Sequence, residues 1–196
     1  LDIASKSGKY PEGTDQSKAI AVFKSKLDTN SRNQLGIIPI KPALDLISNI
    51  NSVADFQKVI SIYATIVSQP FFGISAFSNP SNSSMNSAYL TPVGLGLPDK
   101  DFYLNKDSKS IEIREQYKAH ISRMLQFLGD DKESASSQAE TILNFETLLA
   151  TPKLDKVQRR DFRKLNNPRS VKQIQEMVPA INWPLAFKDL GIEIDL

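Results

Sequence analysis

Residues 109–128 read KSIEIREQYKAHISRMLQFL, and Gly129 follows them. Apolar side chains recur at every third or fourth position of this stretch, which is the spacing of one face of an α-helix. The residues on that face are Ile113, Tyr117, Ile121, Met124 and Leu128. A glycine directly after the last turn is typical of a helix end, because it adopts left-handed backbone angles without strain. The stretch therefore predicts a long amphipathic helix over about residues 109–128.

Other parts of the chain predict further helices. A second long helix is expected over about residues 134–150, and another is expected to begin at Thr14 or Asp15. Capping pairs, in which the first residue of a helix and the residue three positions later can hydrogen-bond each other, occur at Ser52 with Asp55 and at Ser170 with Gln173. The residues expected to point inward on these helices are Ile20, Phe23, Leu27, Phe56, Ile60, Tyr63, Val67, Ala135, Ala139, Ile142, Phe145, Leu149, Val171, Ile174 and Met177. Short helices are expected near residues 43–47 and from Trp183 onward.

One segment has the composition of β-structure. Residues 71–77 and 87–91 are rich in aromatic and β-branched side chains, and the residues 78–86 between them are mostly Ser and Asn. This pattern predicts a β-hairpin with a long loop. The expected fold class is therefore mainly α: a helical domain with one short β-hairpin at about residues 71–91. The chain is expected to form a single segment over residues 1–196, with residues 1–13 a flexible loop.

The composition excludes several classes of protein. The chain has 196 residues, of which 40% are hydrophobic and 23% are charged, and these are the proportions of a globular protein. A net charge of +2 is too small to indicate a nucleic-acid or membrane partner. The absence of cysteine excludes disulfides, zinc knuckles and cysteine nucleophiles within this chain. No apolar run approaches the roughly 20 residues that span a bilayer.

The single histidine limits the catalytic possibilities most. His120 is one position from Ile121 on the predicted long helix, where it is either a general base or metal ligand, or a half-buried helix residue with a hydrogen bond. The second interpretation is favoured, because no other histidine and no cysteine is present to share a metal ion. No Gly-x-Ser-x-Gly segment supports a serine nucleophile. The sequence therefore predicts no catalytic, cofactor-binding or metal-binding residue.

Three other motifs are weak candidates for sites. Residues 94–98 read GLGLP, which lacks the third glycine of a dinucleotide-binding loop and favours a structural loop in which Leu95 and Leu97 enter a core. The basic cluster of residues 159–164 is either an anion or nucleic-acid site, or a solvated helix face paired with Asp155 and Asp161, and the second is favoured. Asn82 begins an N-glycosylation sequon, which matters only in a eukaryotic secreted protein.

Four stretches taken in order resemble one known family. Residues 94–104 read GLGLPDKDFYL, the next helix carries Tyr117, His120, Met124 and Leu128, residues 145–150 read FETLLA, and Arg159-Arg160-Asp161 precedes Pro179 and Trp183. This ordered set is similar to the amino-terminal half of the neprilysin-type zinc metallopeptidases, and it covers about residues 15–190. Phe102 and Leu165 stand where the family usually has tyrosine. The absence of cysteine resembles the bacterial members.

The resemblance implies a zinc endopeptidase that cleaves short peptides, with this chain as part of its helical cap. Family members bind zinc through His-Glu-x-x-His and a downstream Glu, and a chain with one histidine does not supply that site. Zinc is therefore expected in a catalytic half outside residues 1–196, and this segment alone is expected to be inactive. The implied partners are that catalytic domain and short peptide substrates. The implied location is periplasmic or secreted in a bacterium.

Two other functions stay open at this point. One is a stand-alone helical module that binds a protein partner or serves as a scaffold. The other is nucleic-acid binding through the basic cluster of residues 159–164, which predicts binding that weakens steeply with salt. An exposed apolar surface would favour the cap over a stand-alone module.

Overall fold

The computed structural model describes residues 2–66 and 70–193. The chain divides into two compact units, Leu1–Asp45 and Leu46–Leu196, and each is considered by itself. The division falls within helix α4 (Lys41–Ser48). The expectation that the whole chain belongs to one helical cap domain stays a prediction.

The first unit consists of short helices. Its elements are α1 (Asp2–Ser7), α2 (Asp15–Leu27), α3 (Thr29–Leu35) and the single 3-10 turn η1 (Ile38–Ile40). Helix α2 begins at the predicted place, since the Thr14 hydroxyl accepts a hydrogen bond from the backbone N–H of Ser17. None of the residues in these four elements is fully buried.

Two segments of this unit are more helical than the sequence indicated. Residues 2–7 form α1 instead of a loop, with Lys6 paired to Asp2 at 2.9 Å one turn away. The composition of residues 28–36 favours a short turn or the end of a helix, yet residues 29–35 form the helix α3, whose first turn is capped by the Asp28 carboxylate as it accepts the N–H of Ser31. The expected flexibility of residues 1–13 stays a prediction.

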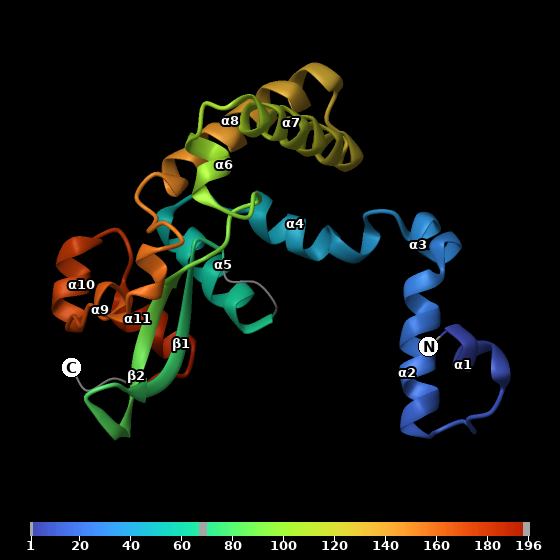
Figure 1. The fold of residues 1–196 in the computed structure, drawn as a ribbon, viewed down its shortest axis with the longest axis horizontal. Helices are drawn as coiled ribbons and strands as arrows, with labels where there is room; N and C mark the ends of the chain where they lie inside the picture. The colour runs from blue at the N-terminus through green and yellow to red at the C-terminus, as the bar shows by residue number, and fades with distance from the viewer. Residues whose placement is uncertain (1, 67–69, 194–196) are drawn as a thin grey trace. The chain divides into compact units, whose positions relative to one another are not determined.

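The second unit holds the remaining helices and both strands that the structure describes (Figure 1). Its elements are α5 (Val53–Ile66), β1 (Phe72–Asn79), β2 (Asn82–Pro92), α6 (Lys100–Leu104), α7 (Ser108–Leu128), α8 (Lys132–Ala150), η2 (Gln158–Arg160), α9 (Phe162–Leu165), α10 (Val171–Met177) and α11 (Trp183–Asp189). The predicted fold class, mainly α with one hairpin, is confirmed. The helix over 109–128 is confirmed as α7, and Gly129 ends it with φ of 112°. Val67, expected on the inner face of α5, lies outside the described residues.

The hairpin differs from the prediction in its loop. Strands β1 and β2 pair antiparallel from Phe72 opposite Pro92 to Asn79 opposite Asn82, so only residues 80 and 81 connect them. The Asn79 side-chain oxygen accepts the backbone N–H groups of Ser81 and Asn82, which forms the tight turn. Residues 82–86 have the composition of a loop, yet they extend β2. They can do so because every side chain in this part of the strand is exposed and needs no apolar character.

Two separate hydrophobic clusters are found among the described residues of this unit. The first joins the hairpin to the last helices, and its buried members are Ile74, Ile181, Trp183, Ala186 and Phe187. Helix α5 is tied to this cluster by Gln57, whose side chain donates to the backbone oxygen of Asn182 and accepts from its N–H. The second joins the Gly94–Pro98 loop to α6, α7 and α8, and its buried members are Leu97, Tyr103, Leu143 and Ala150.

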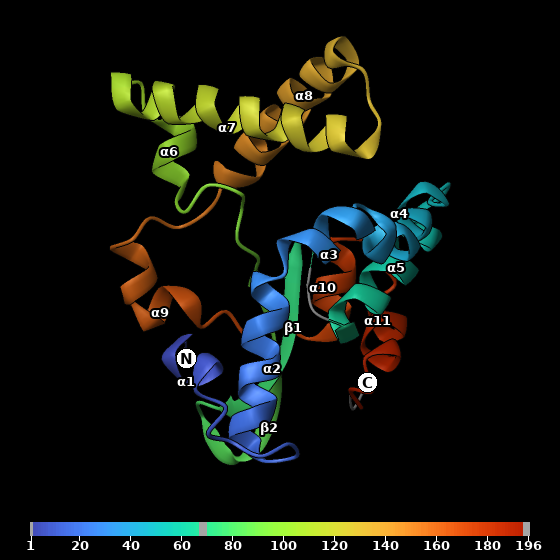
Figure 2. The same ribbon diagram turned by 90° about the vertical axis from the view of Figure 1, so that its right-hand side faces the viewer.

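Helix α8 buries Ala135 and Ala139 as predicted, whereas the buried residues of its second half are each one position from those predicted. Figure 2 shows α7 and α8 lying side by side, and Lys118 of α7 pairs with Glu140 of α8 at 3.1 Å. The buried stripe of α8 comprises Ala135, Ala139, Leu143 and Ala150. Phe145, expected inward, is 46% exposed. Two apolar stripes one position apart overlap in the second half of α8, and packing against α7 selects the one that contains Leu143 and Ala150.

Four other expected core residues lie near the surface: Leu27, Met124, Leu128 and Met177 are exposed. Each lies in the last turn or two of its helix. No helix within residues 2–66 and 70–193 is both long enough and apolar enough to cross a bilayer.

Candidate functional site

The Gly94–Pro98 loop is the centre of the most elaborate polar arrangement in the second unit. Leu97 is buried and Leu95 packs against the same cluster, as the sequence predicted. The backbone N–H of Gly96 donates to Oε1 of Glu146 at 3.3 Å, and the N–H of Leu97 donates to the hydroxyl of Tyr103 at 2.8 Å. These amides therefore serve to hold the loop on α6 and α8 and do not face an open phosphate site.

Glu146 of α8 accepts hydrogen bonds from two tyrosines as well. The Tyr103 hydroxyl donates to Oε2 at 2.7 Å, and the Tyr117 hydroxyl donates to Oε1 at 3.2 Å. Burial, together with the nearby Glu146 carboxylate, raises the pKa of both phenols, that of Tyr117 to about 12. Both phenols are therefore protonated donors at neutral pH, and Glu146 joins α6, α7, α8 and the loop.

Gly96 fits this arrangement because it has no side chain. A Cβ atom at this position would lie 1.7 Å from the Tyr117 hydroxyl oxygen. The loop backbone thus lies directly on the tyrosine, and glycine is needed for close approach. The sequence showed these residues only as parts of matching motifs and missed their common carboxylate. The available signal was that Tyr103, Tyr117 and Glu146 all belong to motifs of the matching family, and Tyr117 and Glu146 lie on two successive predicted helices.

Asp99 forms a second polar link one residue after the loop. Its side chain is 4% exposed and lies 2.7 Å from the guanidinium of Arg159 and 3.9 Å from Nζ of Lys156. It also caps α6 by accepting the N–H of Asp101. The expectation that the basic cluster pairs with Asp155 and Asp161 was wrong for Arg159. Those two aspartates accept backbone N–H groups in the turns at η2 and α9 instead.

Two lysines complete this region by donating to backbone oxygens. Nζ of Lys100 lies 2.5 Å from the carbonyl oxygen of Lys153, and Nζ of Lys153 donates to the carbonyl oxygen of Val93. Burial and the positive charge of Arg159 lower the pKa of Lys153. The lysines therefore join the end of β2 to the segment after α8.

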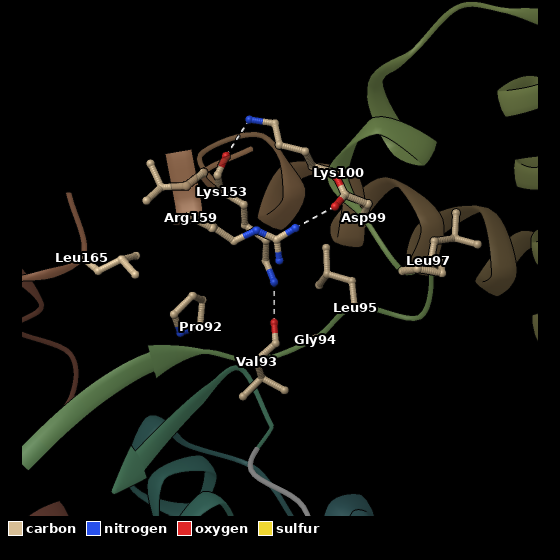
Figure 3. A pocket seen from close by; sticks show the side chains of 12 residues that line it. Pro92, Val93, Gly94, Leu95, Leu97, Asp99, Lys100, Lys153, Arg159 and Leu165 are labelled. Atoms are coloured by element: carbon tan, nitrogen blue, oxygen red, sulfur yellow. Dashed lines mark hydrogen bonds and ion pairs between the residues drawn. The ribbon is translucent and has the colours of Figure 1, made fainter. Parts of the chain in front are cut away.

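A cavity of about 240 Å³ lies between these groups (Figure 3). Its lining residues are Pro92, Val93, Gly94, Leu95, Leu97, Pro98, Asp99, Lys100, Lys153, Leu154, Arg159 and Leu165. A larger cavity of about 580 Å³ shares Pro92–Leu95, Lys153 and Leu154 with it, and extends between Phe71 and the α8 residues Ile142, Phe145 and Leu149. Lys153 therefore lies on the wall of both cavities.

The other candidates from the sequence do not join this region. His120 lies exposed on α7, and the half-buried position expected for it was wrong. Among residues 2–66 and 70–193, no three His, Asp or Glu side chains are grouped as a metal ion would require. The described residues thus do not fit the zinc ion of the neprilysin-type family, which needs two imidazoles. The prediction that the whole segment has no catalytic or metal site stays a prediction.

The family model of the amino-terminal part of peptidase family M13 matches residues 2–195. The chain belongs to peptidase family M13. This confirms the resemblance to the neprilysin-type metallopeptidases. Human endothelin-converting enzyme 1 is 30% identical to this M13 chain over 154 residues, which is 73% of the chain and 20% of the human protein. Mouse endothelin-converting enzyme-like 1 is 27% identical over 192 residues, 88% of the chain and 24% of that protein.

Solved structures agree with this family. The zinc metalloprotease Zmp1 of Mycobacterium tuberculosis, in complex with an inhibitor, superposes with a TM-score of 0.79 at 25% identity over 97% of the M13 chain and 29% of Zmp1. PepO of Lactobacillus rhamnosis has the same fold, with a TM-score of 0.73 at 18% identity over 95% of the chain and 30% of PepO. The M13 chain thus spans about a fifth to a third of the length of these relatives.

Proposed function

We propose that this chain is part of the non-catalytic helical cap of a neprilysin-like zinc metalloendopeptidase that cleaves short peptides, and that it forms part of the wall of the substrate chamber. The observation that carries the proposal is the match of the family model to residues 2–195. The same residues correspond to 29% of a zinc metalloprotease. The chemistry then belongs to zinc and its ligands in polypeptide outside this chain. This chain would contribute steric selection and exclusion of water.

The exposure of large apolar side chains supports a cap over a stand-alone module. Val157, Leu148 and Phe127 are 75%, 72% and 69% exposed, and Phe145 and Phe71 are also exposed. Exposed apolar area costs roughly 25 cal/mol per Å² relative to burial, so such side chains are usually covered by a partner. In this proposal these side chains line the substrate chamber, which the catalytic domain of the same parent chain encloses. Arg159 is paired with Asp99 and is therefore not free to bind a phosphate group, which weakens the case for nucleic-acid binding through the basic cluster.

The catalytic part of the proposal is tested on the 196-residue chain and on the full parent protein. Both are assayed with a quenched fluorescent peptide, and bound zinc is measured by mass spectrometry. We expect the parent to cleave the peptide, to lose activity with a chelator, and to hold one zinc ion. We expect the 196-residue chain to show neither cleavage nor stoichiometric zinc. Chelator-sensitive cleavage by the purified 196-residue chain would refute the proposal.

The chamber wall is tested with single cysteines. The chain has no cysteine, so a cysteine introduced at Phe127, Leu148 or Val157 is the one thiol in this part of the parent. A bulky maleimide on a residue that faces the chamber should reduce kcat/KM more for long peptides than for short ones. Ser83 on the exposed strand β2 gives a matched control. If labelling at all three apolar positions leaves kcat/KM unchanged for long and short peptides, the proposal that this chain forms part of the chamber wall is contradicted.

The location is part of the same proposal. The resemblance implies a periplasmic or secreted bacterial protein. Fractionation of the source cells, followed by detection of the parent polypeptide with an antibody against this chain, tests it. Recovery solely from the cytoplasmic fraction would contradict this part and leave the enzymatic proposal standing.

A further inference from the structure

The 240 Å³ cavity beside the Gly94–Pro98 loop has more positive than negative charge on its wall. Its lining includes Lys100, Lys153 and Arg159 as cations and Asp99 as the one carboxylate within the described residues that line it. Asp99 lies 2.7 Å from Arg159 and is already shared with Lys156 at 3.9 Å. The carboxylate of Glu146, on the wall of the adjoining cavity, accepts its hydrogen bonds from Tyr103, Tyr117 and Gly96.

The two lysines make their hydrogen bonds to backbone dipoles, while the charge of the Glu146 carboxylate also acts on Lys153. Lys100 and Lys153 donate to the backbone oxygens of Lys153 and Val93, which are neutral groups. Figure 3 shows the amine of Lys153 and the guanidinium of Arg159 on the same side of the cavity, near Val93 and Asp99 respectively. Like charges held close together at a partly buried site repel each other, and an anion between them would relieve that repulsion. Burial first, and then the charge of Arg159, lower the pKa of Lys153, and the charge of Glu146 opposes them.

We propose that this cavity is a binding site for a carboxylate whose apolar body lies along the adjoining 580 Å³ cavity. Lys153 and Arg159 bind the carboxylate group. Leu154 and Leu95, which line both cavities, lead from the charged end to Phe71, Phe145 and Leu149. A ligand with one negative end and an apolar end matches both walls, whereas an inorganic anion would leave the apolar wall uncovered. The proposal does not depend on the proposed function.

The test is a titration of the 196-residue chain with butyrate, acetate and inorganic phosphate at constant ionic strength. Calorimetry measures the affinity, and NMR of lysine labelled at Cε follows the pKa of Lys153. We expect the tightest binding for butyrate, accompanied by a rise in the pKa of Lys153. Equal weak affinity for all three anions, or a pKa of Lys153 that no anion moves, would overturn the proposal.

Variants show whether the affinity belongs to this cavity. Lys153→Met keeps the apolar stem and removes the charge, and we expect it to weaken butyrate binding about tenfold, as the loss of one charge-assisted hydrogen bond implies. If circular dichroism shows that Lys153→Met does not fold, Lys100→Met replaces it. Lys100 also lines the cavity, so its loss should weaken butyrate binding as well. Arg160→Gln is the matched control, since Arg160 neighbours Arg159 but does not line the cavity. Equal losses in Arg160→Gln and Lys153→Met would also overturn the proposal.

A longer parent protein distinguishes two sources of the carboxylate. If an acidic side chain elsewhere in the parent occupies the site, the pKa of Lys153 is already raised in the parent and butyrate does not bind. If a free carboxylate is the ligand, the parent binds butyrate as the 196-residue chain does. A parent in which the pKa of Lys153 stays low and butyrate does not bind would contradict both sources.

Discussion

The hydroxyl oxygen of Tyr117 lies 1.7 Å from the place that a Cβ atom on Gly96 would occupy. The same hydroxyl donates a hydrogen bond to Glu146, which in turn accepts the N–H of Gly96. The tyrosine therefore cannot move away without losing its bond to the carboxylate. Residue 96 is fixed as glycine by close approach, since its φ lies outside the left-handed region.

Gly96→Ala should destabilise the chain by about 1–3 kcal/mol, as overpacking in a core usually does. Urea unfolding followed by circular dichroism measures the change. Gly94→Ala is the matched control, because nothing lies within 4 Å of its Cβ position. In a Tyr117→Ala background, Gly96→Ala should lower the free energy of unfolding by less, because the side chain that the new Cβ would meet is gone. The same loss of stability in both backgrounds would show that contact with Tyr117 is not its cause.

Arg159→Ala should lower the free energy of unfolding by roughly 1–3 kcal/mol, because it leaves the buried Asp99 carboxylate without its close partner. Arg160→Ala, next to it, should change stability by less than about 0.5 kcal/mol, as an exposed substitution away from such pairs does. Thermal unfolding of both variants measures the difference. If both variants lose the same stability, the ion pair between Arg159 and Asp99 is not the cause of the loss in Arg159→Ala.

Because the pKa of Tyr117 is raised in the folded chain, the free energy of unfolding should depend on pH in the alkaline range. Burial first, and then the charge of Glu146, raise this pKa from 10 to about 12 in the folded chain. The unfolded state loses the phenolic proton at lower pH than the folded state does. The stabilisation is thus complete below pH 10 and is lost as the pH rises through 12. Urea unfolding from pH 8 to pH 11.5 should show a steeper decline for the wild type than for Tyr117→Phe, and identical slopes would refute this.

Phe71 offers a test of backbone strain, because its φ is 70°, a region that non-glycine residues seldom adopt. Its ring lies 5.3 Å from that of Phe56 and 6.1 Å from that of Phe145. Both Phe71→Ala and Phe71→Gly lose these contacts, but only glycine also removes the strain. We expect Phe71→Gly to be more stable than Phe71→Ala by about 1 kcal/mol. Chemical denaturation measures this difference, and the reverse order would show that the strain is negligible.

Local features of the fold were predictable because their causes lie within a few residues. The capping pair of Ser170 and Gln173 forms both of its hydrogen bonds, and Gly129 ends α7 as expected. The hairpin was predictable from its aromatic and β-branched residues. Its two-residue turn was not, because Ser and Asn favour loops and exposed strand ends alike.

The polar region around the Gly94–Pro98 loop was only partly predictable. Its apolar residues were expected to enter a core, and Leu97 does. The link from Asp99 to Arg159 joins positions 60 residues apart, and the spacing of charges along the chain favoured the nearer Asp155 and Asp161 instead. The signal available in the sequence was the place of Asp99 directly after an apolar loop that was expected to enter a core, where a carboxylate needs a cationic partner.

The sequence by itself determined the helical class of this protein, the places where most helices begin and end, and its family, because caps, periodicity and ordered motifs are properties of neighbouring residues. Tertiary structure alone decided which residues are buried in the second half of α8, which cation Asp99 binds, and that three helices meet at Glu146. Those choices depend on which surfaces approach most closely and on burial. Burial strengthens the interactions between charged groups, because it removes the water that screens them. Neither quantity is defined until the helices have packed.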